Sequence, residues 1–306
     1  TLLPYLGTTG ELKTKPTQHS VKELLSLGVQ PDVLVCRTEH PMQKGMKEKI
    51  ALFCNVDANA VIESRDADTI YDVPLMMQAE GLDQVVLQKL GIAGYPEVDL
   101  RAWHDFLRRY KHPASEVHIG LVGKYVELKD AYKSIKEALE HAGAENECKL
   151  HIKWVHSEKL TAKNVAKHLG GLSGILVAPG FGHRGIEGKI EAIKYARENR
   201  IPFLGICLGM QMAVIEFGRH VLGLADANST VINADTSHPV IAMMEEQKAI
   251  EIKGGSMRLG AYACKLTEGS TVHKVYGRKD ISERHRHRYE FNIAYIDMYM
   301  KAGMSA

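Results

Sequence analysis

Cysteine is scarce and scattered in this sequence. The 306 residues contain five cysteines, at positions 36, 54, 148, 207 and 264, and no two of them form a C-x-x-C pair. An odd number without such pairs disfavours a disulfide framework or a zinc knuckle and suits a reducing compartment. No signal peptide is visible at the start of the sequence. We therefore expect a cytoplasmic protein.

Long apolar runs and an excess of one charge are also lacking. The uncharged stretch at 201–215 spans 15 residues and is interrupted by Pro202, Gly205 and Gly209, whereas a bilayer span needs about 18–20 apolar residues. Lysine and arginine number 39 against 37 acidic residues, a net charge of +2. This balance creates no field that would favour nucleic acid. We expect neither a membrane nor a nucleic-acid partner, and any anion site must be local.

The sequence does contain alternating strand and helix patterns, which predict an α/β fold with two doubly wound units. In residues 1–95 we expect helices at 20–28, 47–53 and 82–90, and strands at 32–37 and 60–62. Residues 96–116 contain two prolines and a polar helix near 103–110, and we interpret them as a linker. Residues 117–306 form the second unit. Its strands are expected at 117–122, 150–155, 174–178 and 202–206, and its helices at 130–143, 161–169, 186–198 and 210–222.

One cysteine stands where an apolar strand must turn sharply into a helix. Gly205 and Gly209 flank Cys207 at minus two and plus two, the spacing of the nucleophile elbow G-x-S-x-G with cysteine in place of serine. The helix N-terminus and exposure at such a bend favour the thiolate. A cysteine in an apolar strand is ordinarily a small core residue. The two flanking glycines favour a nucleophile instead.

A glycine-rich loop follows another strand of the second unit. Residues 178–185, Ala-Pro-Gly-Phe-Gly-His-Arg-Gly, come directly after the strand expected at 174–178. They should therefore lie at the same edge of the parallel sheet as Cys207. Such a loop is often only a turn. Beside an elbow, however, its amides and that of Leu208 could hold the oxyanion that forms when a thiolate attacks a carboxamide.

Several longer strings carry a family resemblance. They are GKYVELKDAYKS at 123–134, RGIEGK at 184–189, GICLGMQ at 205–211, GGSMRLG at 254–260, ERHRHRYE at 283–290, KTKPTQHSVKEL at 13–24 and KIALFC at 49–54. In content and order they resemble the CTP synthase family, whose members join an amidoligase domain to a class I glutamine amidotransferase domain. The resemblance covers nearly all of the chain. It implies that residues 1–95 are the C-terminal part of the amidoligase domain and that 117–306 are a C-terminally truncated amidotransferase domain.

The resemblance also implies roles for particular residues. Cys207 is the implied nucleophile, Gly180 and Leu208 the oxyanion hole, and Gln211 and Arg288 further glutamine-binding residues. UTP or CTP is implied at Lys13, Thr14, Lys15, Pro16, Thr17, Gln18 and Lys49, and ATP at Arg65, Asp66 and Ala67. Considered without the resemblance, the three lysines are most simply solvated surface charges.

The implied reaction joins two chemistries through ammonia. Cys207 attacks the carboxamide of glutamine and forms a thioester that water clears. ATP and Mg²⁺ serve to phosphorylate UTP, and ammonia then displaces the phosphate to give CTP, in a passage that excludes water. The resemblance further implies GTP as an activator, CTP as a feedback inhibitor and a homotetramer. The magnesium ligands and the ATP phosphate loop would lie before Thr1, so we expect an internal fragment with no metal ligand of its own.

Three features depart from the family pattern. The His-Pro-Glu string that supplies a histidine and a glutamate to the nucleophile is absent. Pro179, which has no N–H, stands where an oxyanion amide is expected. Val231 stands where the family commonly places a glutamate that holds the amino group of glutamine. We expect this fragment to be inactive, and two alternatives stay open: another glutamine amidotransferase, or a non-catalytic assembly or regulatory module with the same fold.

Overall fold

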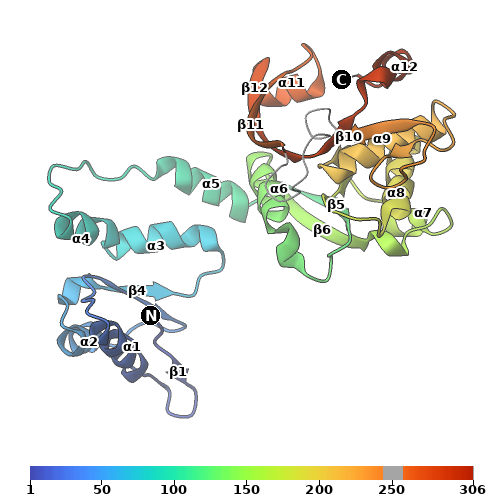
Figure 1. Ribbon diagram of the computed structural model, residues 1–306. Helices are drawn as coiled ribbons and strands as arrows, with labels where there is room; N and C mark the ends of the chain where they lie inside the picture. The colour runs from blue at the N-terminus through green and yellow to red at the C-terminus, as the bar shows by residue number, and fades with distance from the viewer. Residues whose placement is uncertain (244–257, 306) are drawn as a thin grey trace. The chain divides into compact units, whose positions relative to one another are not determined.

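The computed structural model describes residues 1–243 and 258–305. The chain divides into two compact units, Thr1–Lys111 and His112–Ala306, and Figure 1 shows the elements of each. The polar helix expected near 103–110, within the residues interpreted as a linker, is confirmed. Arg101–Lys111 is helix α5, and Trp103 on it donates its Nε1 hydrogen to the Tyr71 carbonyl at 2.8 Å, so this helix packs within the first unit. Residues 254–257 of the GGSMRLG string lie outside the described residues.

The first unit is built on two parallel strands, β3 (Leu34–Thr38) and β4 (Val61–Arg65). Helices α1 (Lys15–Ser26) and α2 (Met46–Cys54) supply most of the side chains that bury them. A two-stranded hairpin, β1 (Tyr5–Leu6) and β2 (Glu11–Leu12), precedes α1. The core comprises Leu3, Leu12, Val21, Leu34, Cys36, Met46, Ile50, Ala51, Cys54 and Val61. Burial of this apolar surface stabilises the unit.

Helix α1 begins five residues before the start expected at residue 20. Ser20 lies inside the helix, where its hydroxyl donates to the Pro16 carbonyl at 3.1 Å. Pro16 explains the earlier start, because proline has a helix-compatible φ and needs no hydrogen-bond partner in the first turn. The string from Lys13 to Gln18 therefore lies at a helix N-terminus.

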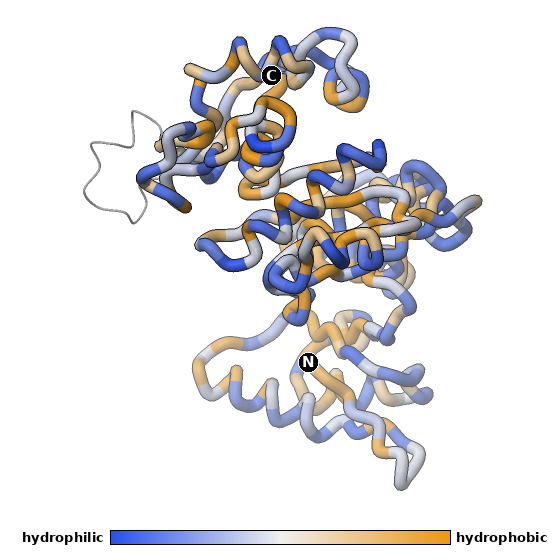
Figure 2. The backbone as a smooth tube through the Cα atoms, turned by 90° about the vertical axis from the view of Figure 1, so that its right-hand side faces the viewer, coloured by the Kyte–Doolittle hydropathy of each residue, from blue (hydrophilic) through white to orange (hydrophobic). Residues whose placement is uncertain are grey.

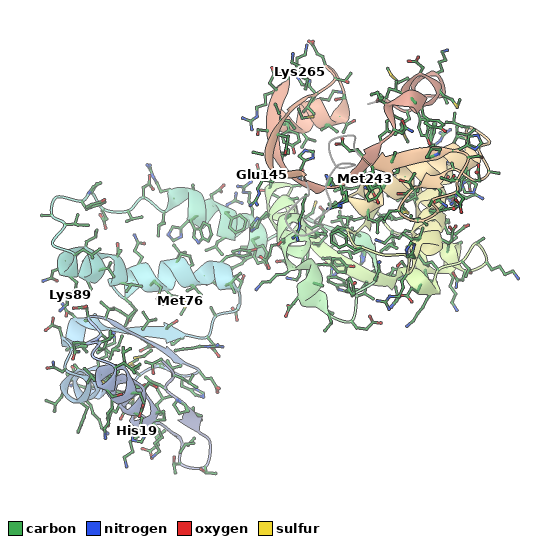
Figure 3. The ribbon with its side chains drawn as sticks, viewed as in Figure 1. His19, Met76, Lys89, Glu145, Met243 and Lys265 are labelled. Atoms are coloured by element: carbon green, nitrogen blue, oxygen red, sulfur yellow. The ribbon has the colours of Figure 1, made fainter. Side chains whose placement is uncertain are left out.

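Two further helices complete the first unit before α5. They are α3 (Val73–Ala79), which the sequence pattern did not predict, and α4 (Leu82–Lys89). Lys89, labelled at the end of α4 in Figure 3, pairs with the Asp57 carboxylate at 2.6 Å. This ion pair ties α4 to the turn before β4.

The second unit is built on a four-stranded parallel sheet with the strand order β6-β5-β7-β8. The strands are β5 (Ser115–Gly123), β6 (Cys148–His156), β7 (Gly174–Val177) and β8 (Phe203–Gly205). The connecting helices are α6 (Lys133–Glu145), α7 (Val165–Leu169), α8 (Ile186–Glu198) and α9 (Leu208–His220). The direction of winding changes between β5 and β7. In such sheets ligands bind beyond the carboxyl ends of the strands at this switch point.

The two faces of this sheet contribute to separate apolar clusters. Leu121 and Leu176 pack with side chains of α6, whereas Val122 and Val177 pack with those of α7, α8 and α9. Figure 2 shows apolar stretches of the backbone in this unit as well as in the first. Because neighbouring residues of a strand face opposite sides, near-continuous apolar strands are what burial on both faces requires.

A second, smaller sheet follows α9. Its strand order is β13-β10-β9, with β9 (Asn228–Ser229), β10 (Pro239–Met243) and β13 (Tyr289–Phe291). Strands β11 (Arg258–Lys265) and β12 (Asp280–His287) form an antiparallel pair joined through α11 (Thr271–Tyr276). Strands β12 and β13 are separated by Arg288 alone. Helix α12 (Ile296–Lys301) is the last element.

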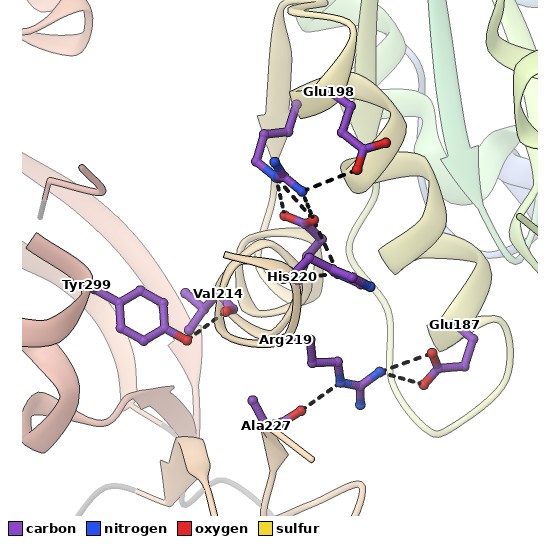
Figure 4. A network of polar contacts seen from close by, with 9 residues as sticks. Glu187, Glu198, Val214, Arg219, His220, Ala227 and Tyr299 are labelled. Atoms are coloured by element: carbon purple, nitrogen blue, oxygen red, sulfur yellow. Dashed lines mark hydrogen bonds and ion pairs between the residues drawn. The ribbon is translucent and has the colours of Figure 1, made fainter. Parts of the chain in front are cut away.

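Polar contacts fix the position of α9 against its neighbours (Figure 4). Glu216 on α9 is 1% exposed and accepts hydrogen bonds from Arg197 on α8 at 2.8–3.1 Å. On another side, the Tyr299 hydroxyl of α12 donates to the Val214 carbonyl at 2.8 Å. The helix that follows Cys207 is therefore held from two directions.

Among the described residues, no helix combines the length and the apolarity that crossing a bilayer requires.

Candidate active site

Cys207 has an unusual backbone conformation at the junction of β8 and α9. Its φ is +55° and its ψ is −107°, and it occupies the N-cap position of α9. A positive φ is uncommon for a residue with a Cβ atom, and strain of this kind costs on the order of 1–3 kcal/mol. The surrounding packing must hold the backbone in this bend, which is the geometry expected of a nucleophile elbow.

Both flanking glycines are required by close backbone contacts. A Cβ atom on Gly205 would lie 2.6 Å from the carbonyl carbon of Gly209, and one on Gly209 would lie 2.2 Å from the carbonyl oxygen of Val177. Neither obstacle is a flexible side chain. The elbow can therefore form only because α9 approaches β7 and β8 more closely than any side chain would allow.

Cys207 opens into a pocket together with the glycine-rich loop. The loop contributes Gly180, Phe181, Gly182 and His183, and the start of α9 contributes Leu208 and Gln211. The remaining lining residues come from the segment after β9 and from the junction of β12 and β13; they are Val231, Ile232, Arg286, His287, Arg288 and Tyr289. The structure thus brings together all five residues expected to serve glutamine: Cys207, Gly180, Leu208, Gln211 and Arg288.

Two buried lysines donate hydrogen bonds to backbone carbonyls of the glycine-rich loop. Lys189 on α8 is fully buried and donates to the Ala178 carbonyl at 2.7 Å. Lys124, 3% exposed and just after β5, donates to the carbonyls of Phe181 and Gly182. In a trans peptide the N–H points away from the carbonyl. Lys124 therefore draws the Phe181 and Gly182 carbonyls toward itself, so that the N–H groups of Gly182 and His183 point away from it. The Ala178 carbonyl, held by Lys189, is followed by Pro179, which has no N–H.

Burial changes the acidity of Cys207 and of the nearby Lys189. Burial raises the pKa of Cys207 above its usual value, although the Leu208 N–H and the charge of Lys189 act to lower it. The sequence predicted the opposite, a pKa lowered by exposure and the helix N-terminus. That expectation is wrong because the thiol is half-buried, and loss of solvation outweighs the favourable contacts. Burial and the charge of Lys124 lower the pKa of Lys189 to about 8.

The expected glutamine-binding side chains also have roles in the fold. The Gln211 side-chain amide donates to the Tyr289 carbonyl at 2.9 Å, which joins α9 to β13. Because Arg288 directly precedes Tyr289, this contact also holds Arg288 at the pocket wall. The Gln211 nitrogen is therefore engaged by the protein itself.

The structure also shows where the departures from the family pattern lie. Val231 lines the pocket with 46% of its surface exposed, so an apolar group faces the space where a carboxylate is expected. Pro179 directly precedes Gly180, which itself lines the pocket. His238, which directly precedes the first residue of β10, pairs with Asp226 and does not line the pocket.

Two lysines and two histidines at this site were given no role on the sequence evidence. Lys124 and Lys189 belong to strings used for the resemblance, yet a lysine pattern alone does not reveal burial. His183 and His287 line the pocket beside Cys207. For His183 the signal was its position in the glycine-rich loop, whereas His287 lies 80 residues after Cys207 and only the tertiary structure brings it there.

In the first unit, two of the lysines expected to bind a nucleotide lie near one carboxylate. Lys13 pairs with Glu11, and the charge of Lys49 on α2 also lowers the pKa of Glu11. Thr14 and Thr17 are buried, and the Thr17 hydroxyl donates to the Leu2 carbonyl at 3.0 Å. The Thr17 side chain therefore serves the fold. Lys15, Pro16 and Gln18 lie in the first turn of α1, and Lys13 precedes that turn.

The residues expected on the ATP side lie at the carboxyl ends of β3 and β4. Arg65, Asp66 and Ala67 line a hollow together with Arg37. The Arg37 guanidinium donates to the Asp66 carboxylate at 2.8 Å. This is the edge at which parallel α/β sheets bind ligands.

Two family models match this chain. The glutamine amidotransferase class-I family matches residues 127–302, which includes every residue that lines the pocket. The CTP synthase N-terminus family matches residues 1–92, which includes both groups of expected nucleotide-binding residues.

Individual relatives agree with these matches. The chain is 63% identical over 306 residues to a CTP synthase of Cytophaga hutchinsonii and 57% identical over 310 residues to one of Methanocaldococcus jannaschii. Those alignments take in 100% and 99% of this chain but only 57% of each relative. Among solved structures, the glutaminase domain of the Trypanosoma brucei CTPS with bound acivicin superposes with a TM-score of 0.57 at 41% identity. The match covers 61% of this chain and 72% of that domain.

Proposed function

The chain belongs to the class-I glutamine amidotransferases and, within them, to the CTP synthase family, and on this premise we propose that it is part of an enzyme that aminates UTP to CTP with ammonia taken from glutamine. The second unit would release the ammonia. The first unit would form part of the site that uses it. The observation that carries the proposal is the strained Cys207 elbow, which shares one pocket with the Gly180 loop.

In the proposed glutaminase reaction, the Cys207 thiolate attacks the carboxamide carbon of glutamine. The carbonyl oxygen becomes an oxyanion, which the amides of Gly180 and Leu208 would stabilise. Collapse of this intermediate expels ammonia, leaves a thioester on Cys207, and water then releases glutamate. Because the resting thiol has a raised pKa, the reaction needs a group that accepts its proton.

For the first unit we propose a pyrimidine-nucleotide site at the N-terminus of α1. Lys13, Lys15 and Lys49 would offset the charge of the triphosphate, and backbone N–H groups at a helix N-terminus add a favourable dipole. The hollow beside Arg65, Asp66 and Ala67 contains two guanidinium groups that suit phosphate. ATP with Mg²⁺ would supply the phosphate that activates the uracil oxygen.

Four finer expectations are also part of this proposal. They are activation by GTP, feedback inhibition by CTP, a homotetramer and a cytoplasmic location. The last is supported by the five cysteines, all of which lie within the described residues and are free thiols.

The proposal is tested in the full-length enzyme by changing the nucleophile. Cys207→Ala should abolish glutamine-dependent CTP formation and leave ammonia-dependent formation unchanged, because only ammonia release uses the thiol. CTP is measured with each nitrogen donor in turn. Cys148→Ala, a half-buried cysteine outside the pocket, serves as the matched control. Equal loss of both activities in Cys207→Ala would contradict this division of labour.

A second candidate function is a non-catalytic assembly or regulatory module. Val231 in the pocket wall and Pro179 before Gly180 favour it, because each removes a group expected to hold glutamine or the oxyanion. A full-length protein that hydrolyses no glutamine but is stabilised by UTP or CTP in a thermal-shift assay would support this candidate. Measurable glutaminase activity would exclude it.

A further inference from the structure

A second group of functional side chains lies at the opposite end of the large sheet from Cys207. Glu116 and His118 are near the start of β5, and His151 is near the start of β6. The pocket lies beyond the carboxyl ends of the strands, so these residues belong to neither the proposed glutaminase site nor the loops that build it. We propose that Glu116, His118 and His151 bind a first-row divalent cation, Zn²⁺ being the best match.

The backbone of the sheet places the three side chains on one face. His118 and His151 are directly paired in the parallel register of β5 and β6. Glu116 precedes His118 by two residues and therefore faces the same side. One ligand atom from each residue lies within 4.8 Å of the other two. Two ligands from one strand and a third from its neighbour are thus held by a rigid scaffold, not by a loop.

Contacts within the group indicate that these side chains are directed toward one another. The two imidazole rings are stacked, with centroids 4.8 Å apart and planes inclined by 15°. The Nε2 atom of His151 lies 3.2 Å from a Glu116 carboxylate oxygen. This nitrogen is buried and forms no hydrogen bond. A buried polar atom without a hydrogen bond is costly, and coordination of a cation by Nε2 would remove that cost.

The donor set indicates which cation would be preferred. Two neutral imidazoles and a carboxylate suit Zn²⁺ and its first-row neighbours, whereas Mg²⁺ and Ca²⁺ prefer oxygen ligands only. Three protein ligands leave at least one coordination position for water. Lys149 and Lys153 flank His151 on the same face of β6 and are exposed. Their charge should weaken cation binding but not prevent it, because exposed lysine side chains can turn into solvent.

The experiment titrates the metal-free chain with Zn²⁺ in a calorimeter. We expect one Zn²⁺ per chain at this site. His118→Asn and His151→Asn should each weaken binding by about tenfold or more, and Glu116→Gln should weaken it less. His19→Asn is the matched control, since His19 is exposed on α1 of the first unit (Figure 3) and should leave binding unchanged.

Two further measurements separate this site from adventitious binding and from misfolding. Co²⁺ in place of Zn²⁺ should give visible d–d absorption without a thiolate charge-transfer band, because no cysteine is among the ligands. Zn²⁺ should raise the melting temperature of the parent chain and of His19→Asn but not of the two histidine variants. Absence of stoichiometric binding, a thiolate band, or undiminished affinity in both histidine variants would overturn the proposal.

Discussion

The two units of this chain differ in the partners and burial of their lysine side chains. In the first unit Lys47 pairs with the carboxylate of Glu80 at 2.6 Å, with both side chains partly exposed. In the second, Lys124 and Lys189 are buried and donate to backbone carbonyls. A buried lysine without a carboxylate partner destabilises a fold. Two of them bonded to one pocket loop indicate that the second unit gives up stability at its candidate active site.

The cysteines show the reverse distribution. Cys36 and Cys54 are fully buried in the core of the first unit, whereas Cys207 is half-buried and opens into the pocket of the second. Cysteine is therefore a buried core residue in one unit and a candidate nucleophile in the other. The difference arises from the backbone around each thiol, since only Cys207 lies at a bend with a positive φ.

The largest expected effect concerns backbone approach. Gly209→Ala should destabilise the second unit by about 3 kcal/mol or more, because its Cβ atom would lie 2.2 Å from the Val177 carbonyl oxygen and overpacking against backbone cannot relax easily. Gly7→Ala in the first unit meets nothing within 4 Å and should change stability by less than about 0.5 kcal/mol. Urea unfolding measures both. Similar effects for the two variants would contradict the close approach at the elbow.

The next effect compares two carboxylates that accept from cationic side chains. Glu216→Ala should cost about 2 kcal/mol, because the glutamate is buried and Arg197 would lose its bidentate partner. Glu80→Ala should cost about 1 kcal/mol, because that ion pair is partly exposed. Thermal unfolding followed by circular dichroism measures both changes. A larger loss of stability in Glu80→Ala than in Glu216→Ala would contradict the expectation that the Arg197–Glu216 contact between α8 and α9 is the stronger of the two.

A third prediction compares the pH dependence of the two units. Burial lowers the pKa of Lys189 to about 8 from its ordinary 10.5, so unfolding takes up a proton between these values and stability should rise with pH across that window. Burial raises the pKa of Cys36 to about 11 from its ordinary 9.0. Unfolding then releases a proton, and stability should fall from pH 9 to 11.

Variants isolate each contribution. Urea unfolding from pH 7.5 to 10 compares the unfolding free energies of Lys189→Met and the parent chain. The variant should exceed the parent in stability by the largest amount below pH 8. The matched variant in the first unit is Cys36→Ala. The difference in unfolding free energy between this variant and the parent chain should become smaller above pH 9. Differences that stay constant with pH would show that neither group is as buried as the structure has it.

The smallest expected effect concerns charge at the pocket wall. No residue that lines the pocket in the described part of the chain is acidic, whereas Lys13 in the first unit has Glu11 beside it. Val231→Glu should strengthen glutamine binding by about tenfold, roughly the effect of one added charge-assisted hydrogen bond. The KM for glutamine in the full-length enzyme measures this change, with Val221→Glu, exposed at the end of α9, as the control. An unchanged KM would place the substrate amino group elsewhere.

Much of the local structure follows from sequence pattern alone. The helix predicted at 186–198 is confirmed as Ile186–Glu198, because its apolar spacing and flanking residues are local signals. Helix ends were less predictable. Gly143, expected to end a helix, lies inside α6, where a Cβ atom would be 2.8 Å from the Cys148 carbonyl oxygen. A glycine retained for close packing has the same appearance in a sequence as a glycine that ends a helix.

By itself the sequence determined the alternation of strands and helices around the large sheet, the glycines around Cys207 and the strings that identify the family, because each depends on residues close together in the chain. Only the tertiary structure decided that β13 meets α9 through the Gln211–Tyr289 contact, and that Lys189 donates to the Ala178 carbonyl at the start of the pocket loop. It also reversed the expected pKa direction of Cys207. Solvation depends on everything that surrounds a group, and those surroundings come from segments far apart in the sequence.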